Sequence, residues 1–222
     1  ALAVIEPEGG FPSASRVLLA TDSDGTPTIL VSALSAHTKA LEADARASLL
    51  TGEPGKGDPL AYPRLTTLCL AEGVERDTPA HRRIRQRFLN RHPKAKLYID
   101  FPDFRFFRLV PQSASLNGGF GRAYLLAASD LLHDAAASES LAAEEAATIA
   151  AIEALAPDVA TELAVKACGA KGGDWRISGL DSAGLDLVSA DEGVRLEFET
   201  SLPTQQDIIY YISKMVYSIR EI

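Results

Sequence analysis

Short apolar runs with polar residues at alternate positions follow one another through residues 1–128. This alternation predicts β-strands, because successive side chains of a strand point to opposite faces. The predicted strands cover residues 1–5, 13–21, 28–34, 45–51 and 65–74. Asp22 to Pro27 has the composition of a tight turn, so residues 13–20 and 28–34 are expected to form a hairpin. Strands this short, joined by tight turns, are typical of an antiparallel barrel.

Two helices interrupt these strands. Ser35 stands where the N-cap of a short helix belongs, directly after the strand 28–34. Thr78 and Pro79 mark the start of another helix over residues 80–91, because proline suits the first helical position. Arginines run round most of this second helix instead of sharing one face. A nucleic-acid interface would gather them on one side, so the sequence predicts no nucleic-acid partner.

The most aromatic stretch of the chain predicts a core strand from Phe104 to Leu109. Alternation places Phe104 and Phe106 on one face of this strand and Arg105 and Phe107 on the other. A glycine-rich turn follows over residues 117–123. Its glycines permit positive φ and a close approach of the backbone to a ligand. The alternative for this turn is a barrel corner that carries a solvated arginine.

The composition changes after residue 127, where the chain becomes rich in alanine and acidic residues. Apolar residues at helical spacing predict helices over 129–132, 141–155 and 158–168, the last closed by Gly169. Three further strands, at 175–181, 185–188 and 194–199, precede a terminal helix over 203–220. The sequence therefore predicts an α+β protein with a barrel domain over residues 1–128 and a small helix-and-sheet domain over residues 140–222.

The chain has 222 residues, 46% of them hydrophobic and 23% charged, as expected of a globular protein with a substantial core. Its net charge of -8 disfavours nucleic acid and anionic membranes, so a phosphate ligand requires a local basic pocket. No apolar run is long enough to span a membrane, and no signal peptide is evident. Cys69 and Cys168 lie far apart in apolar contexts without metal-ligand spacing. Buried free thiols, a cytoplasmic location and no metal site are the expectations.

The start of the short helix at Ser35 is the candidate for binding chemistry. Free backbone amides at a helix N-terminus and the helix dipole favour a phosphate, and His37 and Lys39 add side-chain donors. The alternative is a capped surface helix with two solvated basic residues. The other polar groups are expected to have no binding role. Asp22 and Asp24 are typical of a turn, Glu144 and Glu145 of a helix surface, and His133 is expected to be solvated.

With this helix, the chain resembles the pyridoxamine 5′-phosphate oxidase-like FMN-binding split barrels. In that family an arginine on an early strand, with a serine and basic residues at the helix start, holds the FMN phosphate. The matching positions are Arg16, Ser35, His37 and Lys39, with Thr38 in the same stretch. Within the superfamily the chain is similar to HugZ-type haem-utilisation proteins. The similarity rests on residues 36–41, of which 37–41 match the His-Thr-x-Asn-Leu part of an Ala-x-His-Thr-x-Asn-Leu pattern with Ala40 for the asparagine, on residues 103–109 and on the turn at 117–123.

The resemblance implies an FMN-binding split barrel, a homodimer with flavin sites between the two barrels, and a flavin-dependent oxidoreductase acting on an unidentified small molecule. It also implies substrate-side positions, which here are Thr66, Gly119, Phe120, Gly121 and Arg122. Threonines in strands more often fill a half-exposed face, which is the alternative for Thr66.

Haem breakdown or haem binding, as in HugZ-type proteins, is the alternative function. The tail of those relatives carries histidines where this chain has Ala154 and Val159, and no histidine follows His133. A haem ligand from the tail is therefore excluded. A third possibility is a flavin- or haem-binding protein without turnover, because one fold hosts many functions.

Overall fold

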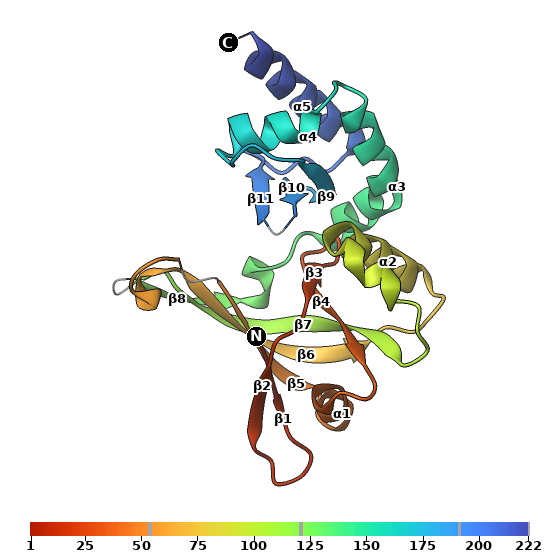
Figure 1. Ribbon diagram of the computed structural model, residues 1–222, viewed down its shortest axis with the longest axis vertical. Coiled ribbons are helices and arrows are strands. Elements are labelled where there is room, and N and C mark those ends of the chain that lie inside the picture. The colour runs from red at the N-terminus through yellow and green to blue at the C-terminus, as the bar shows by residue number, and fades with distance from the viewer. Residues whose placement is uncertain (53–54, 120–121, 191, 222) are drawn as a thin grey trace. The chain divides into compact units, whose positions relative to one another are not determined.

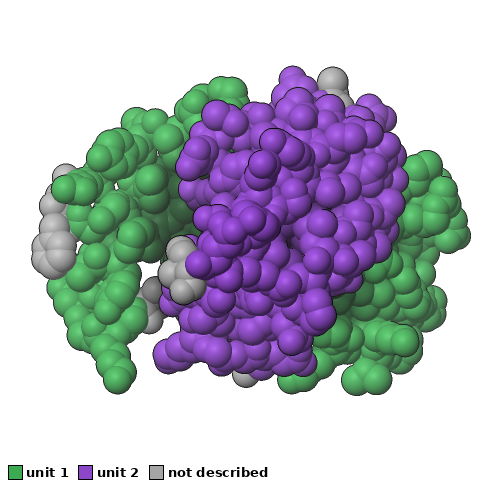
Figure 2. Space-filling model, turned by 90° about the horizontal axis from the view of Figure 1, so that it is seen from above, with its two compact units in different colours: residues 1–132 green, residues 133–222 purple. Residues whose placement is uncertain are grey.

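The computed structural model describes residues 1–52, 55–119, 122–190 and 192–221. The chain divides into two compact units, residues 1–132 and 133–222, which are coloured separately in Figure 2. Among the described residues, no helix is long and apolar enough to cross a membrane. Each unit has its own buried core, so each is described by itself.

The first unit is built on one antiparallel sheet that curls into a half-barrel (Figure 1). The described strands pair in the order β2-β1-β5-β6-β7-β4-β3, and β8 pairs with β7. They are β1 (Leu2–Ile5), β2 (Pro12–Ser15), β3 (Leu19–Thr21), β4 (Pro27–Ser32), β5 (Arg46–Thr51), β6 (Arg64–Gly73), β7 (Phe104–Asn117) and β8 (Ala123–Ala127). A 3-10 turn, Pro59–Ala61, precedes β6, and another, Ala128–Asp130, follows β8.

The predicted single strand over residues 13–21 is wrong, because the structure has β2 and β3 there with residues 16–18 between them. β2 pairs with β1 and β3 pairs with β4, so the two strands form opposite edges of the pairing order. Four residue steps from Ser15 to Leu19 span at most about 15 Å. The two edges must therefore approach each other, and the short link closes the curl of the sheet.

Two helices cover the two faces of this curled sheet. Helix α1 (Ala36–Ala43) buries Ala40 and Leu41 in a cluster with β1, β4 and β5, and α2 (Pro79–Arg91) buries Ile84 and Phe88 on the other side. Phe107 joins the α1 cluster and Phe106 the α2 cluster, which confirms their predicted opposite faces. Both rings are buried because both faces of β7 are covered here.

Most arginines of α2 form hydrogen bonds or ion pairs within the first unit. Arg83 donates two hydrogen bonds to Asp22, Arg87 donates to the carbonyl oxygen of Thr21, and Arg85 pairs with Asp100. Asp22 stands in the predicted turn, which its backbone hydrogen bonds with Thr26 and Gly25 close, but its side chain is fully buried and not at the surface. The reason is tertiary: α2 brings a guanidinium to a carboxylate 61 residues away in sequence.

The second unit packs helices on a three-stranded antiparallel sheet (Figure 1). Its core is an apolar cluster that includes Leu163, Leu187 and Ile212. Its elements are α3 (Ala135–Glu153), α4 (Val159–Glu162), a π-helical turn (Leu163–Ala167), β9 (Arg176–Asp181), β10 (Gly184–Ser189), β11 (Glu192–Glu197) and α5 (Gln205–Arg220). The predicted helix 141–155 begins earlier than expected, because Asp134 caps it by accepting from the amide of Ala137.

Two polar residues expected on the surface of this unit are partly or fully buried. The Nε2 atom of His133 lies 3.4 Å from Asp181, which also accepts from Arg195. Burial alone would raise the pKa of Asp181, but its hydrogen bonds from His133 and Arg195 hold the pKa well below the usual range. Glu145 is buried and accepts from the amide of Leu180. Glu145 thus links α3 to β9, and His133 links the segment before α3 to the same strand.

Candidate functional site

The turn between β4 and α1 is held in place by hydrogen bonds around Ser32. Its hydroxyl donates to Asp103 over 2.7 Å, and its carbonyl oxygen accepts from the hydroxyl of Thr38 over 2.7 Å. The amide of Ala33 donates to the carbonyl oxygen of Asp103. Thr38 is fully buried with its hydroxyl hydrogen directed at Ser32, so the structure gives it a role in fixing the turn.

Ser35 occupies the N-cap position of α1, as the sequence predicted, but its side chain makes no capping hydrogen bond. Its carbonyl oxygen accepts from the amides of Thr38 and Lys39. The hydroxyl of Ser35 is therefore not engaged with the helix and is half-exposed. It remains a donor for an external anion beside the positive end of the helix dipole.

His37 connects this turn to the link between β2 and β3. Its Nδ1 atom lies 3.2 Å from the hydroxyl of Ser15, the last residue of β2. Burial lowers the pKa of His37, so the imidazole is neutral at pH 7 and acts as a single N–H donor instead of a cation. Ser15 was not among the predicted site residues. Its position next to Arg16 was the available signal.

Arg16 and Lys39 are the cations of this corner. Arg16 directly follows Ser15, so the contact between Ser15 and His37 holds its backbone near the start of α1. Both side chains are exposed, and neither has an ion-pair or hydrogen-bond partner among the residues that the structure describes. We call Arg16, Ser35, His37 and Lys39 the α1 corner. It combines free donors of the kind that a phosphate requires.

The other predicted site residues lie elsewhere on the sheet. Thr66 pairs with Ser115, and Gly119 and Arg122 belong to the turn that joins β7 to β8. Phe120 and Gly121 lie outside the described residues. Arg122 is exposed, and its carbonyl oxygen accepts from Gly118 across the turn.

These residues are separate from the α1 corner along the sheet. From Ser15, the pairing runs to Leu2, then to Leu49, and then to Thr67, the neighbour of Thr66. Three strand spacings correspond to about 15 Å. The Gly119 turn lies farther on, after Asn117 at the end of β7.

Gly119 is a position where the backbone requires glycine. Its φ is +78°, and an added Cβ atom would lie 2.4 Å from the carbonyl oxygen of Ala61. We expect Gly119→Ala to lower the free energy of unfolding by about 2–4 kcal/mol, since both strain and a backbone clash act there. Gly57→Ala is the matched control: its φ is +93° with no atom nearby, so only about 1–2 kcal/mol is expected. If urea unfolding showed equal losses of stability in the two variants, the predicted clash with Ala61 would be contradicted.

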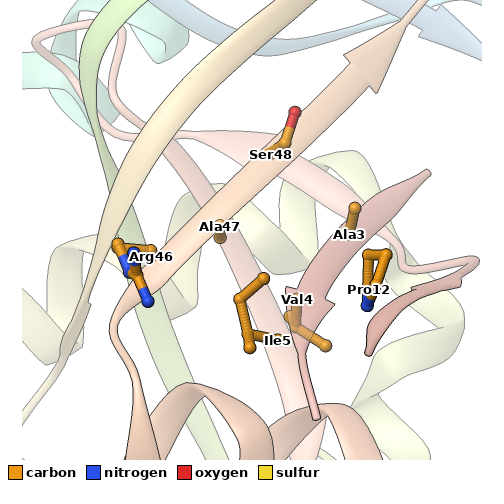
Figure 3. A pocket seen from close by; sticks show the side chains of 7 residues that line it. All are labelled: Ala3, Val4, Ile5, Pro12, Arg46, Ala47 and Ser48. Carbon is orange, nitrogen blue, oxygen red and sulfur yellow. The ribbon is translucent and has the colours of Figure 1, made fainter. Parts of the chain in front are cut away.

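The sheet face that carries Thr66 is uncovered and apolar. Leu50, Thr66, Ser115 and Leu125 are successive partners across four strands, so their side chains share this face. Leu68 and Leu70, two and four residues after Thr66, lie on the same face, and the four leucines are exposed. A hollow of about 260 Å³ opens beside it between β1, β2 and β5 (Figure 3). Its lining, which includes Ile5, Pro12 and Arg46, contains none of the predicted site residues.

No group of three or more metal-binding side chains occurs within the described ranges. Cys69 is buried and Cys168 is half-buried, and both are free thiols. Burial raises the pKa of Cys69 to about 11, so this thiol is protonated at neutral pH. The imidazole of His81 lies against Phe106, and Nε2 of His92 contacts the carbonyl oxygen of Leu19.

Comparison with known proteins identifies the family to which the chain belongs. Residues 6–133 match the family described as CREG, beta-barrel, and the chain belongs to this family. The predicted α+β class and split-barrel fold are thereby confirmed. Atu2129, a protein of unknown function from Agrobacterium tumefaciens, is 33% identical with a TM-score of 0.83, over 96% of this chain and 87% of that one.

One relative in sequence and one protein of similar fold have names that mention haem. A chloroplastic heme oxygenase of Arabidopsis thaliana, HOZ, is 37% identical over 119 residues. These residues make up 52% of this chain and 35% of HOZ, so the chain spans about a third of the length of that relative. A heme binding protein from Mycobacterium smegmatis has a TM-score of 0.55 at 24% identity, over 100% of this chain and 91% of that chain, which shows a likeness of fold alone.

Proposed function

We propose that the protein binds FMN at the α1 corner and acts as a flavin-dependent oxidoreductase. The observation that supports this proposal is the contact between Ser15 and His37, because Arg16 directly follows Ser15 in the chain. Arg16, Lys39 and the hydroxyl of Ser35 then hold the phosphate, and neutral His37 donates one hydrogen bond. FMN supplies the hydride and electron transfer when it is bound, whereas the protein supplies binding and orientation.

A homodimer completes the proposed site. The uncovered leucines of β5, β6 and β8 form an apolar face of the kind that marks an interface. A second copy on this face would bring its Thr66 and Arg122 toward a cofactor held by the α1 corner of the first. Analytical ultracentrifugation in the presence of FMN measures the mass, and a monomer under those conditions contradicts the proposal.

Titration of the full chain with FMN, followed by quenching of flavin fluorescence, tests the α1 corner. Each charge-assisted hydrogen bond to a phosphate contributes about 1.5–3 kcal/mol, so Arg16→Ala and Lys39→Ala should each weaken binding by about ten-fold or more. Lys171→Ala removes an exposed lysine of the second unit and should leave binding unchanged. The proposal fails if the wild-type chain does not bind FMN, or if both corner variants bind as tightly as it does.

Haem binding at the same corner is the second candidate function. The similarity to HOZ and the position of His37 favour it, because Nδ1 is directed to Ser15 and Nε2 has no partner among the described residues. A neutral imidazole is the form that coordinates iron, and Arg16 and Lys39 suit the carboxylates of a porphyrin. A Soret band on titration with haemin, without FMN quenching, would select this candidate.

A further inference from the structure

The negative charge of the chain is concentrated in one unit. Residues 133–222 carry 16 acidic and 6 basic side chains, whereas residues 1–132 carry 14 acidic and 16 basic ones. Within the first unit, residues 78–99 contain seven arginines and lysines and no acidic residue. The average charge therefore hides a basic segment, which consists of α2 and the 3-10 turn Pro93–Leu97 after it.

Four of the seven cations are engaged inside the first unit. Arg83, Arg85 and Arg87 make the contacts described above, and Arg82 donates to the carbonyl oxygen of Asp77. The other three, at the end of the segment, are exposed and have no partner among the described residues: Arg91, Lys94 and Lys96. Their charge is available to an external anion.

Large apolar side chains protrude beside these cations. Leu97 is 79% exposed, and Phe101 is 52% exposed with its ring edge against Phe104. In a 3-10 turn residues i and i+3 eclipse, so Lys94 and Leu97 project from the same side. Leu34 is 80% exposed on the neighbouring turn, where the amide of Ala33 donates to the carbonyl oxygen of Asp103.

We propose that this surface, formed by Arg91, Lys94, Lys96, Leu97, Phe101 and Leu34, binds an anionic lipid membrane. Lysines beside single protruding apolar side chains match the headgroup region, where apolar residues insert and cations meet anionic lipids. A protein partner is less suited, because lysine is depleted at protein interfaces. The whole-chain charge predicted no membrane partner, but the attraction is local, since screening limits it to about 8–10 Å.

Vesicle sedimentation of the full chain tests this inference without any cofactor. The wild-type chain should sediment with vesicles of phosphatidylcholine and phosphatidylglycerol, and less with phosphatidylcholine alone or in high salt. Each cation near an anionic surface changes binding about five-fold, so Lys94→Ala with Lys96→Ala should weaken it about twenty-five-fold. Leu97→Ser should weaken it as well, because the inserted side chain is lost.

Matched variants control for charge and hydrophobicity elsewhere. Lys171→Ala removes an exposed lysine of the second unit, and Leu60→Ser removes a leucine that is 64% exposed on the 3-10 turn Pro59–Ala61, and neither should change vesicle binding. Equal binding to both vesicle types, no binding, or insensitivity to the Lys94, Lys96 and Leu97 changes would overturn the inference. Binding to soluble polyglutamate without vesicle binding would also overturn it and assign the surface to an acidic protein. FMN titration is unaffected by these outcomes.

Discussion

Asp22→Ala is expected to lower the free energy of unfolding by about 3–5 kcal/mol, because it leaves the partly buried guanidinium of Arg83 without its carboxylate and removes one of the two carboxylates beside Arg108. Asp22 has no exposed side-chain surface, and it accepts from Arg83 over 2.6 and 2.8 Å and lies 3.2 Å from Arg108. Arg83 belongs to α2 and Arg108 to β7, so the carboxylate joins three parts of the first unit. Urea unfolding measures the loss.

Asp100→Ala is the matched control for this prediction. Asp100 forms a similar two-point pair with Arg85 of the same helix, but its side chain is 62% exposed. An exposed pair contributes at most about 1 kcal/mol, so a small loss is expected. Losses of similar size in the two variants would show that burial does not set the strength of the Asp22 contacts.

The Asp22 contacts also predict a dependence on pH. Burial raises the pKa of Asp22, but hydrogen bonds from Arg83 and Ser23 and the charges of Arg83 and Arg108 outweigh it, so the pKa lies below its ordinary value. A lowered folded-state pKa stabilises the protein above the unfolded-state pKa, and this stabilisation is lost as the pH falls through the folded-state value. The wild-type chain should therefore lose more stability in acid than Asp22→Asn does.

The His37→Ala variant is expected to show whether the α1 corner binds FMN or haem. If His37 coordinates haem iron, its loss should weaken haem binding by at least about 100-fold, more than the loss of a supporting residue around a ligand. If the corner holds FMN, only one neutral hydrogen bond is lost, and binding should weaken about 2–10-fold. Titrations with FMN and with haemin, read by fluorescence and absorbance, measure the two effects.

His37→Gln and the pH profile refine this test. Glutamine retains a polar group toward Ser15 but does not replace an imidazole as an iron ligand, so it should restore FMN binding and not haem binding. Burial lowers the pKa of His37, so iron coordination should hold through neutral pH and decline only below that lowered value. A large loss of haem binding in His37→Ala that glutamine fully restores would contradict coordination by the imidazole.

Local patterns in the sequence were sufficient for most elements of the first unit. Alternation identified β5 and β6 to within one residue at either end, and Thr78 with Pro79 identified the start of α2. Periodicity and capping act over a few residues, so they can be read without the rest of the chain. The same reasoning failed over residues 13–21, because partners at opposite edges of the sheet divide that segment.

The binding role of the candidate site stays a prediction, but part of its arrangement followed from the sequence. Ser35, His37 and Lys39 lie close together at the start of α1, and Arg16 entered from the family resemblance. Helix spacing fixes the first group, whereas the position of Thr66, Gly119 and Arg122 on the sheet depends on which strands pair. The partial burial of His37, which lowers its pKa, could not be predicted, since it depends on the contact with Ser15 of β2.

The sequence by itself determined the class of fold, the position of most helices and strands, and the basic composition of the helix start that carries the α1 corner. Only the tertiary structure decided which polar groups are buried, that Asp22 and Glu145 are internal acceptors, and that three cations of a basic segment have no partner within the described part of the chain. The reason is that side-chain burial and ion pairing depend on contacts between residues tens of positions apart, which no local pattern specifies.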